Sequence, residues 1–273
     1  MSLRRSLRNL GLCLLTAAWL GLSACSGTTG GKHVTFSAVA VGVKATSGHT
    51  LSFDNAFGYH VTLTRARLYV GAIYLNQSVP SSGAQETACV LPGIYVAEVF
   101  GPLEVDALSA AQQSFPFEGE GNALAAKAAE LWLSGADAQV HKDINDVSNA
   151  PLILDAAGTA QKAGVSFPFE AKLTIGANRV IAASDPAYPG ANPICKQRIV
   201  TPIPVEITAS DAGKLVLHVD PRRWFEAVDF SLLPQVSTTP VLYAFSDAPT
   251  QAADINLYNA LRARSGVYRI AWE

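Results

Sequence analysis

Residues 59–76, YHVTLTRARLYVGAIYLN, carry the strongest β-strand pattern of the chain and decide its fold. Val61 and Leu63 alternate with polar residues, as in a strand with one buried face. The alternation then changes parity, because the next large apolar side chain, Leu68, stands at an even position. A long strand that changes face in this way predicts a β-bulge, or a crossing between two sheets, at residues 65–67.

Further stretches rich in valine, threonine and phenylalanine lie on both sides of this strand. Turn-forming glycine, proline and asparagine residues separate them, as in folds built from many short strands. We predict strands at residues 33–44, within 47–58, at 90–105, from 152 past 164, and at 179–183, 203–209, 215–220 and 266–272.

Helices are predicted at fewer places. Residues 122–133 (NALAAKAAELWL) combine a capping asparagine with helix-favouring alanine and leucine. Residues 136–147 are a second short candidate, and residues 251–264 predict a helix near the end of the chain. The expected fold is mainly β: an antiparallel β-sandwich with two or three inserted or terminal α-helices. We expect a single domain over residues 33–273, with the helical insertion around 122–147.

The start of the chain has the composition of an export signal. Arg4, Arg5 and Arg8 precede an apolar run at residues 10–21, and residues 1–24 contain no acidic side chain. This order is typical of a secretory signal peptide. The apolar run is too short to span a bilayer, which requires about 20 residues.

The sequence LSAC at residues 22–25 resembles the lipobox of bacterial lipoproteins. The resemblance implies that the Cys25 thiol receives a diacylglycerol, and that residues 25–32 become a lipidated tether after cleavage. Ser26, in place of aspartate, implies the outer membrane, with the protein facing the periplasm. Two other interpretations stay open: ordinary cleavage nearby that leaves Cys25 as a free thiol, or a chance match within a signal sequence.

Charge and cysteine content agree with an exported protein. Without residues 1–24 the chain has 17 basic and 22 acidic residues, a formal charge of −5, and no basic run. We therefore expect no nucleic-acid partner. Cys13 lies in the leader, so Cys89 and Cys195 remain, and an oxidising compartment favours a disulfide between them. A redox or metal pair is the alternative.

Catalytic motifs are absent from the sequence. It contains no G-x-S-x-G, H-E-x-x-H or C-x-x-C motif and no phosphate-binding glycine loop. We predict no catalytic residue and no cofactor.

Histidines supply the candidate metal ligands. Imidazole together with carboxylate suits copper or zinc, and Asp137 precedes one histidine by four residues. The alternative is that these histidines are solvated surface groups. The five candidates are His33, His49, His60, His141 and His218.

A second candidate site follows the strand at residues 215–220. Arg222, Arg223 and Trp224 come directly after an Asp-Pro turn. Arginine beside tryptophan can bind an anion or a sugar, with the indole as a stacking face. The alternative is a structural corner in which Trp224 packs inward.

Two stretches resemble a known family. SGHTLSFDNAFGYHVTLTRARLYVGAIYL (residues 47–75) and LVLHVDPRRWF (residues 215–225) are similar to the β-sandwich periplasmic proteins associated with methanobactin and copper handling. The resemblance implies a β-sandwich and raises the expectation of metal binding. None of that family's metal-binding residues matches a position here, so it implies no site.

The sequence therefore predicts a membrane-anchored envelope lipoprotein with a non-catalytic binding or scaffolding role. A scaffolding role would require an envelope protein as its partner. The alternative is a periplasmic protein that binds or handles copper or zinc, and an enzyme ranks third.

Overall fold

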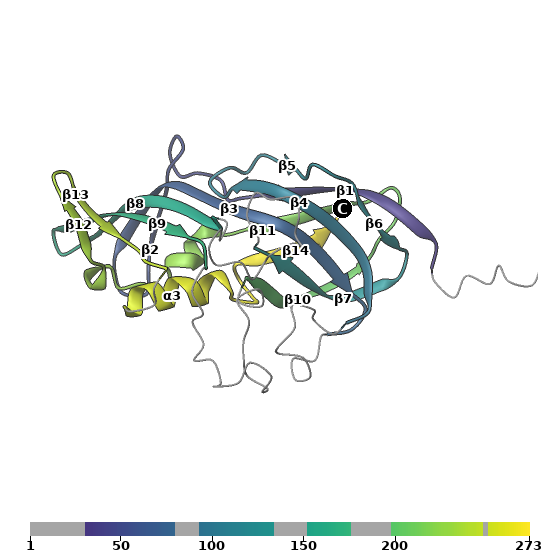
Figure 1. Cartoon of the computed structure of the whole chain (residues 1–273). Helices are drawn as coiled ribbons and strands as arrows, with labels where there is room; N and C mark the ends of the chain where they lie inside the picture. The colour runs from purple at the N-terminus through teal and green to yellow at the C-terminus, as the bar shows by residue number, and fades with distance from the viewer. Residues whose placement is uncertain (1–30, 80–92, 134–151, 176–197, 248–250) are drawn as a thin grey trace, which may run out of the picture. The chain divides into compact units, whose positions relative to one another are not determined.

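The computed structural model describes residues 31–79, 93–133, 152–175, 198–247 and 251–273 (Figure 1). His33–Glu273 forms one compact unit. It contains an α-helix, α3 (Ala252–Leu261), and two 3-10 helices, η1 (Pro221–Phe225) and η2 (Phe230–Leu232). The strands are β1 (His33–Val41), β2 (Leu51–Asp54), β3 (His60–Asn76), β4 (Tyr95–Asp106), β5 (Gln113–Ser114), β6 (Gly119–Asn122), β7 (Ala125–Trp132), β8 (Leu154–Lys162), β9 (Val165–Leu173), β10 (Ile199–Thr208), β11 (Lys214–Val219), β12 (Gln235–Thr238), β13 (Val241–Ala244) and β14 (Tyr268–Trp272).

The prediction of a mainly β fold is confirmed. In the described part of the chain, the strands join into one sheet whose main order is β12-β13-β9-β8-β3-β4-β6-β1-β11-β14. β2 and β7 also pair with β3, β5 pairs with β1, and β10 pairs with β7. The sheet is mixed: β1 pairs with β11 and β13 pairs with β9 in parallel. Both pairs join segments far apart in sequence, and such long connections permit parallel pairing.

β3 is the central strand of the sheet and pairs with four other strands: β2, β4, β7 and β8. Its register against β8 shifts between Leu63 and Arg65, and its register against β4 shifts after Val70. At the first shift β3 has one more residue than β8, and at the second β4 has one more residue than β3. At each shift the side chains that follow change face relative to the partner strand. The main core therefore receives Leu63 before the first shift, Leu68 after it and Ile73 after the second. The parity change in the sequence marks a bulge within one strand.

The main core is closed by aromatic side chains from several elements. The Phe169 ring of β9 lies 5.3 Å from the Phe225 ring of η1 and 4.9 Å from the Phe230 ring of η2, centroid to centroid. The helix α3 adds Leu257 and Leu261 to the same core. The predictions of a helix near residues 251–264 and of a last strand after it are confirmed.

The predicted helix at residues 122–133 is wrong, because this segment forms β7. β7 lies between β3 and β10, and from Ala128 to Trp132 its side chains are buried on both faces. Ala129 and Leu131 join the main core, whereas Trp132 packs on the opposite face. Backbone pairing on both sides outweighs the helix preference of alanine, which is worth less than about 1 kcal/mol per residue. The candidate helix at 136–147 and the strand at 179–183 lie outside the described residues.

Candidate functional site

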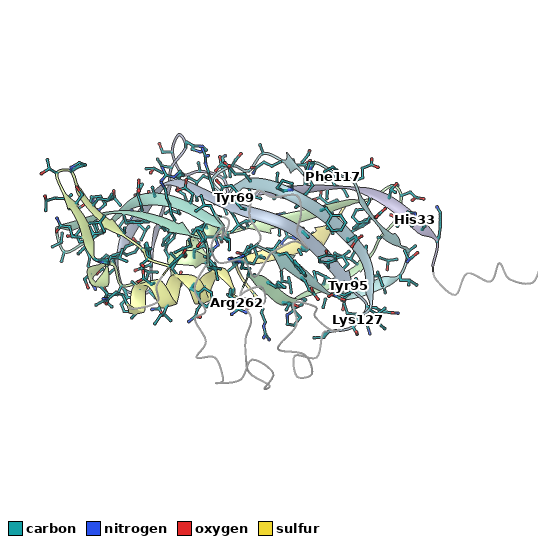
Figure 2. All side chains as sticks on the ribbon, in the orientation of Figure 1. His33, Tyr69, Tyr95, Phe117, Lys127 and Arg262 are labelled. Atoms are coloured by element: carbon teal, nitrogen blue, oxygen red, sulfur yellow. The ribbon has the colours of Figure 1, made fainter. Side chains whose placement is uncertain are left out.

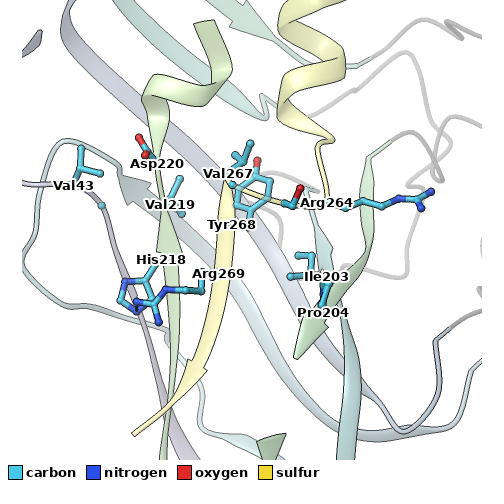
Figure 3. Close-up of a pocket in the computed structure, with 13 residues that line it drawn as sticks. Val43, Ile203, Pro204, His218, Val219, Asp220, Arg264, Val267, Tyr268 and Arg269 are labelled. Carbon is cyan, nitrogen blue, oxygen red and sulfur yellow. Dashed lines mark hydrogen bonds between the residues drawn. The ribbon is translucent and has the colours of Figure 1, made fainter. Parts of the chain in front are cut away.

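An open cavity of about 450 Å³ lies where two sheet edges come close together (Figure 3). Ile203 and Pro204 of β10 line one side, and the end of β11 with the start of β14 lines the other. β10 pairs with β7 and β14 pairs with β11, and the described residues show no ladder joining β10 to β14. Small-molecule sites in proteins occupy roughly 300–1,000 Å³, so this cavity has the size of a ligand site.

His218 and Arg269 face each other at this cavity (Figure 3). They are register partners on β11 and β14, and Arg269 Nη2 lies 2.7 Å from His218 Nε2. Burial lowers the pKa of His218, and the charge of Arg269 lowers it further. The imidazole is therefore neutral at pH 7 and accepts a hydrogen bond from the guanidinium.

Arg269 brings a positive charge that no carboxylate neutralises among the described residues. The ion pairs found there do not include it. Asp220 also lines the cavity, but Arg222 binds both of its carboxylate oxygens, with Nε at 2.8 Å and Nη2 at 2.7 Å. The wall near Arg269 is therefore suited to an anion rather than to a metal cation.

The candidate group after β11 forms a corner. Asp220 caps η1 by accepting a hydrogen bond from the Arg222 backbone nitrogen. Trp224 is fully buried in the main core, so its indole presents no face to a sugar. Arg223 Nη1 lies 4.0 Å from Glu226 Oε2 at the surface. Of the three residues, only the two arginines reach solvent.

The four described histidines do not come together as a metal centre. His49 Nε2 lies 3.2 Å from Asp106, His60 Nδ1 lies 2.8 Å from Asp54, and His33 begins β1. Each of the two contacts joins one histidine to one carboxylate. No group of three metal-ligating side chains exists among the described residues. His141 lies outside them.

The cysteine predictions also fall outside the described residues, for Cys25 as well as for Cys89 and Cys195. Lipidation and disulfide pairing remain expectations from the sequence. None of the described helices is long and apolar enough to cross a membrane.

A buried carboxyl group on β7 was missed by the sequence analysis. Glu130 is fully buried and accepts hydrogen bonds from Asn76 Nδ2 at 3.0 Å, Trp132 Nε1 at 3.2 Å and the Tyr95 hydroxyl at 3.3 Å. Tyr74 packs beside this group, with its ring 5.2 Å from that of Trp132. Glu130 and Trp132 lie on the same face only if this segment is a strand. Because the segment was predicted as a helix, this pairing was not expected.

Burial raises the pKa of Glu130, and its three hydrogen bonds oppose that rise only in part. The folded protein therefore holds this proton more tightly than the unfolded chain. The free energy of unfolding falls as pH rises from about 4.5 through the folded-state pKa, by at most about 1.4 kcal/mol per pH unit.

Replacing Glu130 by glutamine is expected to remove this fall, because glutamine keeps a buried acceptor and has no charged form. Urea unfolding at a series of pH values from 4 to 8 measures the difference. Glu120→Gln, at an exposed position on β6, is the control and should keep the wild-type profile. A Glu130→Gln protein with the wild-type pH profile would contradict this account.

Comparison with known proteins assigns neither a family nor a function to this chain. No protein-family model, curated protein or solved structure matches the chain.

Proposed function

We propose that this chain is a lipid-anchored protein of the bacterial envelope with a non-catalytic binding role, and that its β domain binds a small anionic ligand. The leader and the LSAC sequence at residues 22–25 support the anchor and the outer membrane as its location. The single observation that carries the binding role is the cavity between β10 and β14, with Arg269 at its wall.

The charges around the cavity support an anion. A guanidinium forms paired hydrogen bonds with carboxylate or phosphate oxygens, and Arg269 has donors left after its bond to His218. Arg222 neutralises Asp220, the carboxylate at this cavity. Val43, Ile203 and Val267 supply apolar surface for the rest of a ligand.

His218 would couple this binding to pH. An anion beside the imidazole favours its protonated form, so the bound state has a higher pKa at His218 than the free state. The free state already has a pKa below the ordinary value of 6.5. Affinity should therefore rise as the pH falls from the pKa of His218 in the bound state to its lower pKa in the free state.

We expect wild-type protein to bind citrate or phosphate saturably with one equivalent, and Arg269→Gln to bind it at least tenfold more weakly. The variant keeps much of the side-chain length and removes the charge. Isothermal titration calorimetry at 0.15 M salt and pH 8 measures the affinity. The rise in affinity between pH 8 and pH 6 is measured with sulfate, which keeps its double charge over this range, whereas citrate and phosphate take up protons. This salt concentration screens weak surface attraction beyond about 8 Å.

Arg67→Gln is the matched control, because Arg67 pairs with Glu104 at 2.8 Å on another part of the sheet. It should bind the same anion within twofold of wild type. Equal affinity in Arg269→Gln and wild type, or no saturable binding of either anion, would refute the proposed binding role.

The copper or zinc alternative has no comparable support. It would need ligands brought together, whereas the described histidines lie in separate places with no third ligand at any of them.

We also propose that two regions of the sheet pack face to face as a sandwich, antiparallel in most of its pairs. One core contains side chains from both halves of the strand order, including Leu63 and Leu68 of β3 and Leu215 and Leu217 of β11. A shared core of this kind is what face-to-face packing provides.

A further inference from the structure

One end of the sheet lies where the chain enters the β domain. Gly121 of β6 pairs with Val34 of β1 and with Ala97 of β4. Both ladders are antiparallel, so β1 and β4 run in the same direction. Moving one residue back along each strand places Val96, near the start of β4, level with His33, the first residue of β1. The β3–β4 end of the sheet is therefore the end at which β1 begins, and the tether is joined to the chain at His33.

Exposed apolar side chains occupy this end. Val79 and Ile94 are each 58% exposed and Tyr95 is 39% exposed. They lie at the facing ends of β3 and β4, where the Gln77 backbone nitrogen donates to the Ile94 carbonyl at 2.9 Å and Asn76 pairs with Tyr95. Exposed aliphatic and aromatic side chains that gather at one place, unlike scattered ones, make that place a candidate contact surface.

A lysine lies at the same end. Ala128 of β7 pairs with Asn76 of β3, which places the exposed Lys127 level with Gln77. Figure 2 shows Tyr95, Lys127 and His33 towards the same end of the sheet. The exposed Glu120 on β6 is set back from the rim, since it pairs with Thr35 inside β1. We call Val79, Ile94, Tyr95 and Lys127 the tether-end rim.

The tether limits how far this rim can lie from a membrane. Residues 25–32 span at most about 28 Å when fully extended, at roughly 3.5 Å per residue. Val79 and Ile94 supply aliphatic surface for the headgroup boundary, and Lys127 can extend its amine to lipid phosphates. The Tyr95 hydroxyl donates to the buried Glu130, so Tyr95 adds only ring surface to this rim. We propose that the tether-end rim rests on the lipid headgroups, an inference that relies on the proposed Cys25 anchor for its membrane.

Photo-cross-linking tests this contact without natural lipidation. The mature chain, with a hexahistidine tag in place of Cys25, is held on vesicles of phosphatidylethanolamine and phosphatidylglycerol that contain a nickel-chelating lipid. We expect Ile94→p-benzoylphenylalanine to give at least fivefold more lipid adduct, measured by mass spectrometry, than Val236→p-benzoylphenylalanine.

Val236 is the matched control because its exposure, 57%, is almost the same. It lies on β12, whose Gln235 is level with Leu63 of β3 through the ladders of β13, β9 and β8. That level is 13 residues from Asn76, or about 40 Å along β3.

A second variant keeps the probe at residue 94 and adds Val79→Asp, which should lower the adduct at least threefold. Equal yields at residues 94 and 236, or no lipid adduct at residue 94, would overturn the proposal. The tag holds the protein on the vesicle in every case. If no lipid adduct forms at residue 94, the proposal that Cys25 is lipidated still stands. If Cys25 is found without lipid, the adduct yields measured with the tagged protein still stand.

Discussion

Replacing Gly158 by alanine is expected to lower the free energy of unfolding by about 3 kcal/mol, the upper part of the range for overpacked sites. Gly158 lies on β8 opposite Leu63, where the register of β3 shifts. A Cβ atom at this position would lie 2.3 Å from the Thr62 carbonyl oxygen and 3.1 Å from Leu63 Cα. Both are backbone atoms of the central strand, so relief requires the ladder itself to move. Urea unfolding followed by circular dichroism measures the loss.

Gly164→Ala, at the turn that joins β8 to β9, provides the control in the same hairpin. Free space surrounds a Cβ atom there, and the cost comes from the positive φ of 80°, roughly 1–2 kcal/mol. A loss at Gly158 no greater than that at Gly164 would show that β3 and β8 do not approach as closely as described.

The second large effect is expected at the N-terminus. Cys25→Ala should lower incorporation of labelled palmitate more than tenfold in the bacterium, because a thiolate is the nucleophile for the lipid transfer and alanine has none. Cys13→Ala makes the same change inside the predicted leader and should keep the label. Palmitate incorporation that persists in Cys25→Ala would mean that the lipid is attached elsewhere, and a wild-type chain without label would mean that it is not lipidated.

The central strand was predictable from its residues. Alternation of apolar side chains identified residues 59–76 as a strand, and the change of parity marked the bulge within a residue or two. The pattern could not decide between a bulge and a crossing of sheets, because both reverse the parity of the side chains.

β7 was mispredicted for a physical reason. Local preference favours a helix in an alanine-rich segment. Small side chains also fit a strand that is covered on both faces, and only the pairing with β3 and β10 makes this segment such a strand. Contacts that arise from distant segments are not present in the local pattern.

The candidate site was partly predictable. His218 stood out in the sequence, and the structure places it at the cavity. Arg269 did not, because 51 residues separate it from His218 and only the β11–β14 ladder joins them. Trp224 was proposed as a binding face, but sequence spacing after a turn does not determine whether an indole points outward or into the core.

The mass of the N-terminal peptide, from protein extracted from bacterial membranes, tests most directly whether this is a lipid-anchored envelope protein. The proposal predicts a peptide that begins at Cys25 and carries the added mass of a diacylglyceryl group and an acyl chain. A peptide that begins at another residue, or an unmodified Cys25, would contradict it.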